Sequence, residues 1–463
     1  MSLLHSEPSA CEGQFDGAAV DFTYAGGRGE LGLRYRANGS TEAIDGQSII
    51  ACIADGDEHA LLYVDAPTDA QALPAFKSAR ARNLPPAFVA DNLLRQKPVA
   101  TPDAGIHVVV STKSGTCLAE QFYNDALVPL LRALGLQEDL DYAVHRTRSA
   151  NTVTELTRDI FLPAANDGVT QRIIVLAGDG GILDITNGLL AGARSERFVP
   201  PAVALLPVGT GNALAHSSGV TDDNTWGLAT LARGETAALP LLRATFSPGA
   251  RLLVDEGSRE EELPLRDLDG RPIVYGAVVC SWGMHAGLVA DSDTAEYRKY
   301  GVERFQMAAK EALYPADGGE PHHYRGKVSL LKVSEGLDSW TPLERREHAY
   351  VLATLVSRLE KTFMISPSSA PLGGELRLVH FGPMAGDEVM RVMGLAYQGG
   401  KHVDEPAVGY EAVDGVRIDF EGAEEEARWR RICVDGKIVR VEKSGWVEMR
   451  RERAQVVELV RDT

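Results

Sequence analysis

Two glycine-rich stretches carry the residues whose chemistry is easiest to read. Gly178-Asp179-Gly180-Gly181 follows an apolar run at residues 172–177, and Gly209-Thr210-Gly211-Asn212 follows another at residues 202–207. Apolar residues then recur at helical spacing after each turn, which predicts strand–turn–helix units. Glycines let the backbone approach a ligand closely, and the free N–H groups at a helix N-terminus suit phosphate. The two turns therefore predict a phosphate site, with Asp179 beside it.

One glycine turn alone is a weak signal, because the same pattern opens many βα units that bind nothing. The second turn strengthens the prediction. Two such turns on neighbouring parallel strands would face each other at the carboxyl edge of the sheet, where open α/β folds bind ligands.

The rest of the chain supplies the elements that would position these turns. Further strand–turn–helix units begin near residues 106 and 141, so residues 101–238 are predicted to form an α/β nucleotide-binding domain, a parallel sheet with helices on both faces. Short strand-like runs without regular helices follow, which predicts an antiparallel β-sandwich domain at residues 239–463. Residues 1–100 alternate in the manner of strands and predict a small β-rich N-terminal module whose role is not readable.

Composition narrows the classes of partner. The 463 residues carry a formal net charge of −18, which argues against nucleic acid and against strong adsorption to anionic lipid. The five cysteines lack the spacing of a zinc or redox motif, and the N-terminus lacks a secretory signal, so we expect a cytoplasmic protein with at most peripheral membrane contact. Residues 272–290 contain no charged side chain, but their glycines favour a core strand and a glycine-rich turn over a membrane span.

The two glycine turns, with Asn187-Gly188 between them, resemble the catalytic domain of the diacylglycerol kinase and sphingosine kinase superfamily. The stretches at residues 281–293 and 296–305 resemble the sphingosine kinase branch, and the likeness extends from about Ile106 to Trp446. It implies a kinase that uses ATP and Mg²⁺ to phosphorylate the primary hydroxyl of a sphingoid long-chain base. The alternatives are a diacylglycerol or ceramide kinase, and a pseudokinase that binds nucleotide or lipid without turnover.

The resemblance also implies roles for individual residues. Asp179 would orient the acceptor hydroxyl and accept its proton, and Asp291 would meet the ammonium group of the base. Leu288 and Phe305 would contact the lipid beside Asp291, and Phe305 begins a predicted helix whose apolar side could cover an acyl chain. The nucleotide would be held by glycine amides and by polar or cationic side chains, namely Ser111, Lys113, Thr147, Gly178, Gly180, Gly181, Gly209, Thr210, Gly211, Asn212, Arg298, Arg304, Asp435 and Lys437.

Two segments depart from the family pattern. The loop after residue 110 keeps few of the residues expected there, since Ser111 stands where the family has asparagine and only Lys113 offers a charge. Lys437 stands where the family has a glutamate near nucleotide and magnesium, which reverses the local charge. This lysine either weakens the binding of magnesium and ATP or contacts phosphate directly, and no residue is assigned as a metal ligand.

Overall fold

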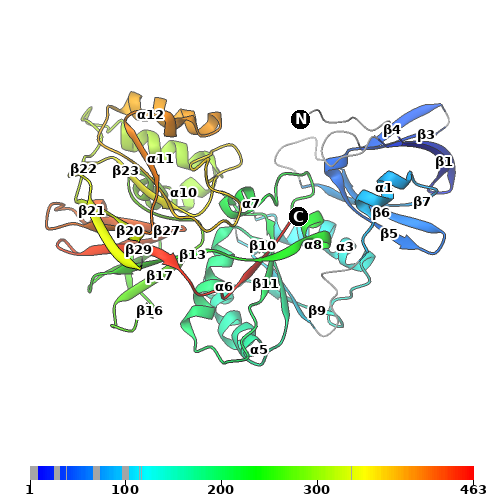
Figure 1. Cartoon of the computed structure of the whole chain (residues 1–463), viewed down its shortest axis with the longest axis horizontal. Helices are drawn as coiled ribbons and strands as arrows, with labels where there is room; N and C mark the ends of the chain where they lie inside the picture. Colours follow the sequence, from blue (N-terminus) through cyan, green and yellow to red (C-terminus); the bar gives the residue numbers. More distant parts are fainter. Residues whose placement is uncertain are drawn as a thin grey trace.

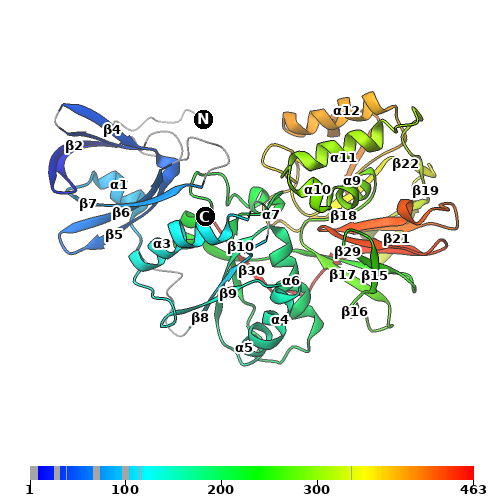
Figure 2. The same cartoon turned by 180° about the vertical axis from the view of Figure 1, so that it is seen from behind.

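The computed structural model describes residues 9–24, 32–37, 39–65, 73–95, 104–113, 115, 117–334 and 336–462. Figures 1 and 2 show three parts in a row: a β-rich module at one end, an α/β domain in the middle and a sheet-rich part at the other end. The predicted boundary at residue 100 lies outside the described residues.

The N-terminal module is one antiparallel sheet with the strand order β4-β3-β2-β1-β7-β6-β5, followed by helix α1 (Pro86–Asn92). Buried and exposed residues alternate along its strands, as expected for a sheet with one face on a core. Ile50 and Leu62 of the module pack in one apolar cluster with residues of the central domain. The module is therefore packed against that domain. The strands are β1 (Ser9–Phe15), β2 (Ala18–Tyr24), β3 (Leu33–Ala37), β4 (Ser40–Ile44), β5 (Ile49–Asp55), β6 (Glu58–Asp65) and β7 (Ala75–Arg82).

The central sheet has the order β12-β30-β11-β10-β8-β9, and the four strands from β11 to β9 pair in parallel. Successive residues of β10 face opposite apolar clusters, with Ile173 in one and Ile174 in the other, because helices cover both faces. This is the predicted parallel sheet with helices on both faces. Its strands are β8 (Gly105–Val110), β9 (Tyr142–Arg146), β10 (Gln171–Ala177), β11 (Ala202–Pro207), β12 (Glu235–Ala238) and β30 (Glu458–Arg461).

Two of the covering helices contain a π-helical turn just before a proline, Pro129 or Pro163. Proline lacks the N–H that an α-helix needs, and a widened turn accommodates that loss without ending the helix. The helical segments are α2 (Ala119–Phe122), η3 (Tyr123–Leu127), α3 (Val128–Ala133), α4 (Thr152–Leu156), η4 (Thr157–Phe161), α5 (Leu162–Asn166), α6 (Asp179–Ala191), α7 (Ala213–Ser217) and α8 (Leu228–Arg233).

The third part contains two antiparallel sheets that contribute to one apolar core around the fully buried Trp282. The first has the order β16-β17-β13-β29-β26-β20-β21, and the second β15-β14-β28-β27-β18-β23-β24-β25. The first sheet comprises β13 (Leu241–Phe246), β16 (Leu265–Arg266), β17 (Pro272–Gly276), β20 (Lys327–Ser334), β21 (Leu337–Pro342), β26 (Gly415–Asp419) and β29 (Trp446–Glu452). The second comprises β14 (Arg251–Val254), β15 (Arg259–Glu262), β18 (Val279–Gly283), β23 (Tyr350–Thr354), β24 (Arg377–Phe381), β25 (Val408–Ala412), β27 (Arg431–Val434) and β28 (Lys437–Arg440).

Two features differ from the sequence-based expectation. Residues 284–292 form a helix rather than a glycine-rich turn, and it begins directly after Gly283, whose φ of +87° disfavours other residues. The central sheet takes strand β30 from the end of the chain, which was assigned to the second domain. Four helices lie on the sheet-rich part: α9 (Met284–Ser292), α10 (Ala295–Arg298), α11 (Glu303–Leu313) and α12 (Gly386–Gly394).

Candidate active site

Three turns meet at the carboxyl ends of β8, β10 and β11. A Cβ atom at Gly209 would lie 2.3 Å from the Cα of Gly178, so the second and third turns touch through their glycines. Gly115, with a φ of +53°, touches the same place, because its Cβ would lie 2.8 Å from the carbonyl carbon of Gly209. Only glycine fits at these contacts, and the predicted meeting of the turns is confirmed.

Asn212 shapes the third turn from within. Its backbone is left-handed, with φ of +51°, and its Oδ1 accepts the N–H of Gly209 at 3.1 Å. Its Nδ2 donates to the carbonyls of Pro207 and Gly209 at 3.2 and 3.0 Å. The side chain therefore holds the backbone amides of this turn in position.

Asp179 begins helix α6 and points across to the start of α7. Its two carboxylate oxygens accept the backbone N–H groups of Ala213 and Leu214 at 2.8 and 2.9 Å. Burial raises the pKa of Asp179, although these two hydrogen bonds oppose the shift. The raised pKa makes this carboxylate a stronger base than an exposed aspartate, and therefore better suited to accept the proton of an acceptor hydroxyl.

Asp435 belongs to the sheet-rich part and is buried close to Asp179. Its carboxylate accepts the N–H groups of Ala277, Val278 and Val279 at distances between 2.5 and 3.1 Å. Burial raises its pKa to about 7 against these hydrogen bonds, and the charge of Asp179 adds to the shift. Asp435 therefore ties the turn after β27 to the segment between β17 and β18.

Two further contacts join helix α6 to the sheet-rich part. Asn187 exchanges hydrogen bonds with the backbone of Tyr275, at 3.1 Å to its N and 3.0 Å to its O. Lys437 places Nζ 2.9 Å from Oδ1 of Asp184, and both side chains are largely buried. Lys437 thus acts as a bridge between the two parts.

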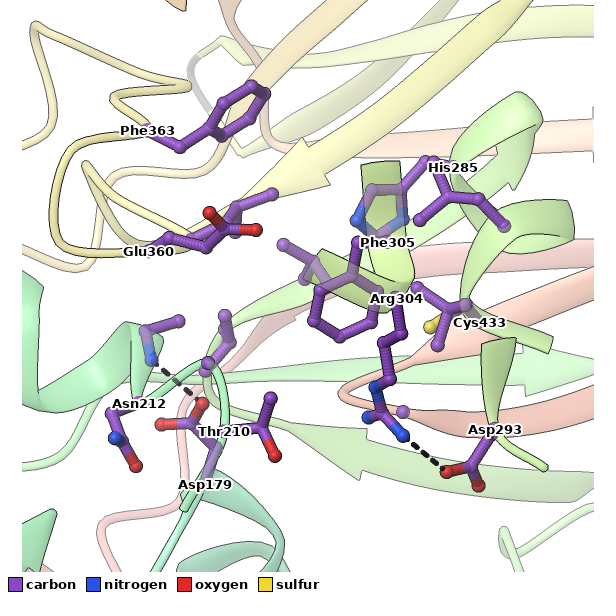
Figure 3. Close-up of a pocket in the computed structure, with 18 of the residues that line it drawn as sticks. Asp179, Thr210, Asn212, His285, Asp293, Arg304, Phe305, Glu360, Phe363 and Cys433 are labelled. Atoms are coloured by element: carbon purple, nitrogen blue, oxygen red, sulfur yellow. Dashed lines mark hydrogen bonds and ion pairs between the residues drawn. The ribbon is translucent and has the colours of Figure 1, made fainter. Parts of the chain in front are cut away.

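A cavity of about 570 Å³ lies between the glycine turns and the helices of the sheet-rich part, and Figure 3 shows many of its side chains. Most of the predicted site residues line it: Lys113, Gly178, Asp179, Gly180, Gly209, Thr210, Gly211, Asn212, Leu288, Arg298, Arg304, Phe305 and Asp435. The structure thus brings together residues from segments more than 300 positions apart in the sequence.

Two arginines and an aspartate form the cationic corner of the cavity. Arg304 and Arg298 both contact Oδ1 of Asp293, at 3.2 and 3.0 Å. Burial acts to raise the pKa of Asp293, but the two guanidinium groups outweigh it and hold that pKa below its usual range. Nε of Arg304 is buried without a hydrogen-bond partner among the described residues. Both arginines retain donors for phosphate oxygens.

The other end of the cavity is mostly apolar. Glu360 is one of its few polar residues, and burial raises its pKa to about 7 while the hydroxyl of Tyr397, on η5 (Leu395–Gln398), hydrogen-bonds to it. This compartment is suited to a hydrocarbon chain. Its apolar lining consists of Met284, Leu288, Val289, Phe305, Ala309, Leu359, Phe363, Met390 and Met393.

Three residues predicted to contact nucleotide lie outside the cavity lining and have structural contacts instead. Oγ1 of Thr147 accepts the N–H of Thr112 at 3.1 Å, so it supports the first turn from behind. A Cβ at Gly181 would lie 2.9 Å from that of Ala177, so this glycine lets α6 pack on β10. The N–H of Ser111 donates to Leu176 at 3.1 Å within the sheet.

Asp291 and Lys437 also lie outside the lining. Oδ1 of Asp291 is 2.7 Å from Arg431 Nη1, and its Oδ2 is 3.8 Å from Arg428, so this carboxylate is engaged on the outer side of α9. Asp293, two positions later, lines the cavity and Asp291 does not, so a contact between Asp291 and the lipid ammonium stays a prediction. Sequence reasoning also assigned no site role to Glu360 and Tyr350, which lie outside the matched stretches, or to His285, which lies within the stretch at residues 281–293.

The described residues contain no group of three or more histidine, cysteine, aspartate or glutamate side chains placed to hold a metal ion. Asp179 and Asp435 accept hydrogen bonds from backbone amides, and Asp184 is paired with Lys437. A site built from protein ligands alone does not fit these residues. Mg²⁺ that arrives on a nucleotide needs no such site, because it is held mainly by phosphate oxygens and water.

Comparison with known proteins shows which proteins this chain resembles. Residues 105–244 match the family described as the diacylglycerol kinase catalytic domain. Sphingosine kinase 1 of Homo sapiens is 23% identical over 328 residues, covering 64% of this chain and 77% of the relative. Residues 105–244 thus match a diacylglycerol kinase catalytic domain, and the chain is a lipid kinase that is similar to the sphingosine kinases. The kinase is also 25% identical to sphingosine kinase 2 of Homo sapiens over 77% of its own length and 46% of that relative.

Solved structures agree with this fold. A Bacillus anthracis str. Sterne protein assigned as a diacylglycerol kinase aligns over 78% of the kinase and 98% of its own chain, with a TM-score of 0.50 and 15% identity. A second structure so assigned gives a TM-score of 0.51 and 14% identity. Among the described residues of the kinase, no helix has the length and apolar character needed to span a membrane.

Proposed function

We propose that this lipid kinase transfers the γ-phosphoryl group of ATP to the primary hydroxyl of a sphingoid long-chain base. The observation that carries the proposal is the single cavity, which combines glycine turns and arginines at one end with an apolar compartment at the other. Asp293 lies beside the arginines. This arrangement suits a lipid with a cationic head and a hydrocarbon tail.

The chemistry follows from the positions of the side chains. The acceptor hydroxyl oxygen forms a bond to the γ-phosphorus of ATP, the bond from that phosphorus to the β–γ bridging oxygen breaks, and ADP leaves. Asp179 accepts the hydroxyl proton. Lys113, Arg298 and Arg304 balance the charge of the phosphate oxygens, and the glycine turns provide backbone N–H groups. Mg²⁺ enters with ATP as part of the substrate.

Asp293 takes over the role first given to Asp291. A carboxylate has about four lone-pair positions, so the contacts with the two arginines leave room for an ammonium group. A charge-assisted hydrogen bond contributes about 1.5–3 kcal/mol. Diacylglycerol and ceramide lack this ammonium, and we therefore expect them to be poorer acceptors.

The test uses purified kinase, labelled ATP and mixed micelles that contain sphingosine, phytosphingosine, ceramide or diacylglycerol. Phosphate is expected on the primary hydroxyl of the free bases. Asp293→Asn should lose at least about tenfold in kcat/KM for the bases. Asp291→Asn is the matched control and should leave their use nearly unchanged, because Asp291 faces Arg431 outside the cavity. A preference for diacylglycerol, or equal effects of the two variants, would contradict the proposal.

A further inference from the structure

A small polar cluster interrupts the apolar compartment of the cavity. It consists of Tyr350, His285, Cys433 and Ser281, of which the first three line the cavity. Tyr350 lies on β23, where its main chain pairs with Gly283 and Phe381 of the neighbouring strands. His285 lies on the first turn of α9 and Cys433 on β27, so three separate elements converge on this cluster.

The Tyr350 hydroxyl has no hydrogen-bond partner in the part of the chain that the structure describes. The residue is 1% exposed, and its Oη is buried without a hydrogen bond to any of the residues that the structure describes. Its ring is fixed by stacking on Phe381, at 5.1 Å between centroids, and by an edge contact with His285 at 6.0 Å. A buried hydroxyl without a hydrogen bond is unfavourable. The packed neighbouring rings keep the Tyr350 ring in place, so its hydroxyl cannot move to another partner.

His285 presents a second polar atom to the same space. Its Nδ1 is 2.7 Å from Oγ of Ser281, which fixes the imidazole and leaves Nε2 for another partner. In the view of Figure 3 the imidazole lies beyond Phe305 as seen from Asp179, on the side of the cavity away from the phosphate-binding turns. The cluster therefore faces the chain of a bound lipid rather than its reacting end.

The cluster is neutral, which limits what it can recognise. Burial lowers the pKa of His285 to about 4, so the imidazole is uncharged at neutral pH. Burial raises the pKa of the Cys433 thiol to about 12 and raises that of the Tyr350 hydroxyl further. Neutral donors and acceptors in an apolar wall fit an uncharged hydroxyl, which both donates and accepts, better than an ammonium or a phosphate.

We propose that Tyr350 and His285 form a subsite for a hydroxyl group on the hydrocarbon chain of the acceptor, so that the kinase prefers chain-hydroxylated long-chain bases. This inference rests on the proposed function, because it assumes that the apolar compartment holds the acceptor chain. The hydroxyl would satisfy Oη of Tyr350, and a plain chain would leave that atom buried and unpaired. A site that hydrogen-bonds a hydroxyl disfavours an analogue that lacks it, because the polar groups of the site are then left unpaired.

The test compares long-chain bases of equal length that carry no chain hydroxyl, a hydroxyl on carbon 4, or a hydroxyl near mid-chain. Wild-type kinase is expected to show a kcat/KM about tenfold higher for one of the hydroxylated bases than for the plain base. Tyr350→Phe should bring that ratio close to one while the rate on the plain base is kept. Tyr24→Phe, which removes a hydroxyl bonded to Asp91 in the N-terminal module, should keep the wild-type ratio.

Equal use of the three bases by wild type, or a ratio unchanged by Tyr350→Phe, would overturn the inference. Calorimetric Kd values for the same bases separate it from the proposed function. If a hydroxylated base binds more tightly than the plain base, and Tyr350→Phe removes this difference, the subsite is supported. This holds even if no phosphate is transferred, because the absence of transfer would contradict only the proposed reaction. Equal Kd values for all bases would contradict the subsite.

Discussion

Four carboxyl groups line the cavity, and their surroundings shift their pKa values in different directions. Two arginines hold the pKa of Asp293 down against its burial, whereas burial raises that of Asp179. Burial raises the pKa values of Asp435 and Glu360 to about 7. Neighbouring carboxyl groups with separated pKa values can take different roles at one pH. Asp293 is suited to pairing with a cation, and Asp179 to receiving a proton.

Replacing Asp179 by asparagine is expected to lower kcat by a factor of about 10² to 10⁴, because the carboxyl group that receives the acceptor proton is lost. The amide also places a donor against the N–H of Ala213 or Leu214, which should lower the free energy of unfolding by about 1–3 kcal/mol. Single-turnover rates and thermal melting separate the two effects. A variant that is less stable but retains its rate would show that Asp179 is not the base.

Glu360 predicts a dependence of stability on pH. Its folded-state pKa of about 7 lies above the ordinary value of 4.5, so the folded protein holds a proton that the unfolded chain has released between these pH values. The stabilisation is complete below about pH 4.5, declines as the pH rises and is lost above about pH 7. Glu360→Gln should therefore show a smaller fall in melting temperature between pH 5 and pH 8 than wild type. Equal slopes would contradict the shifted pKa.

At the scale of elements, the strand–turn–helix units could be predicted because their signals are local. Apolar runs, glycine turns and helical spacing fall within about 20 residues of one another, and the meeting of the turns follows from parallel pairing. The different contacts made by individual glycines within one turn could not be predicted. Gly178 and Gly181 look equivalent in the sequence, but one touches the neighbouring turn and the other touches β10.

The different surroundings of Asp291 and Asp293 could not be predicted for a related reason. Asp291 is still within α9, but Asp293 is past its end, with φ of −91° and ψ of 47°. Helical periodicity therefore no longer determines where the second side chain points. Tyr350, His285 and Glu360 were missed because their approach depends on the packing of strands and helices distant in sequence.

The bridge between α6 and β28 predicts an effect of charge reversal. Lys437→Glu places a second carboxylate beside Asp184, and we expect it to lower the free energy of unfolding by about 1–3 kcal/mol and to make the melting temperature rise with added Mg²⁺. Lys443→Glu is the matched control, because it reverses the same charge beside Glu425 on the exposed surface, where an effect below about 1 kcal/mol is expected. Equal losses of unfolding free energy in the two variants would show that the ion pair of Lys437 with Asp184 stabilises the protein no more than an exposed ion pair does.

At the scale of the molecule, the three parts are joined by shared apolar packing and by the last strand. Leu459 on β30 is fully buried in the central domain, although the preceding strand β29 belongs to the sheet-rich part. Leu459→Ala is expected to lower the free energy of unfolding by about 2–5 kcal/mol, measured by denaturant titration. Leu268→Ala, at a fully exposed position, should change it by less than about 0.5 kcal/mol. If Leu459→Ala lowered the free energy of unfolding as little as Leu268→Ala, the packing of β30 in the central sheet would contribute little to stability.

The return of β30 to the central sheet has a consequence for biosynthesis. Strands β8 to β11 leave the ribosome early, but β30, which pairs with both β11 and β12, is made only after the whole sheet-rich part. At a synthesis rate of about 5–20 residues per second, translation of the 250 residues between β11 and β30 takes on the order of tens of seconds. During that interval the edge of β11 lacks its partner strand, and an exposed strand edge is a site of strand-to-strand association.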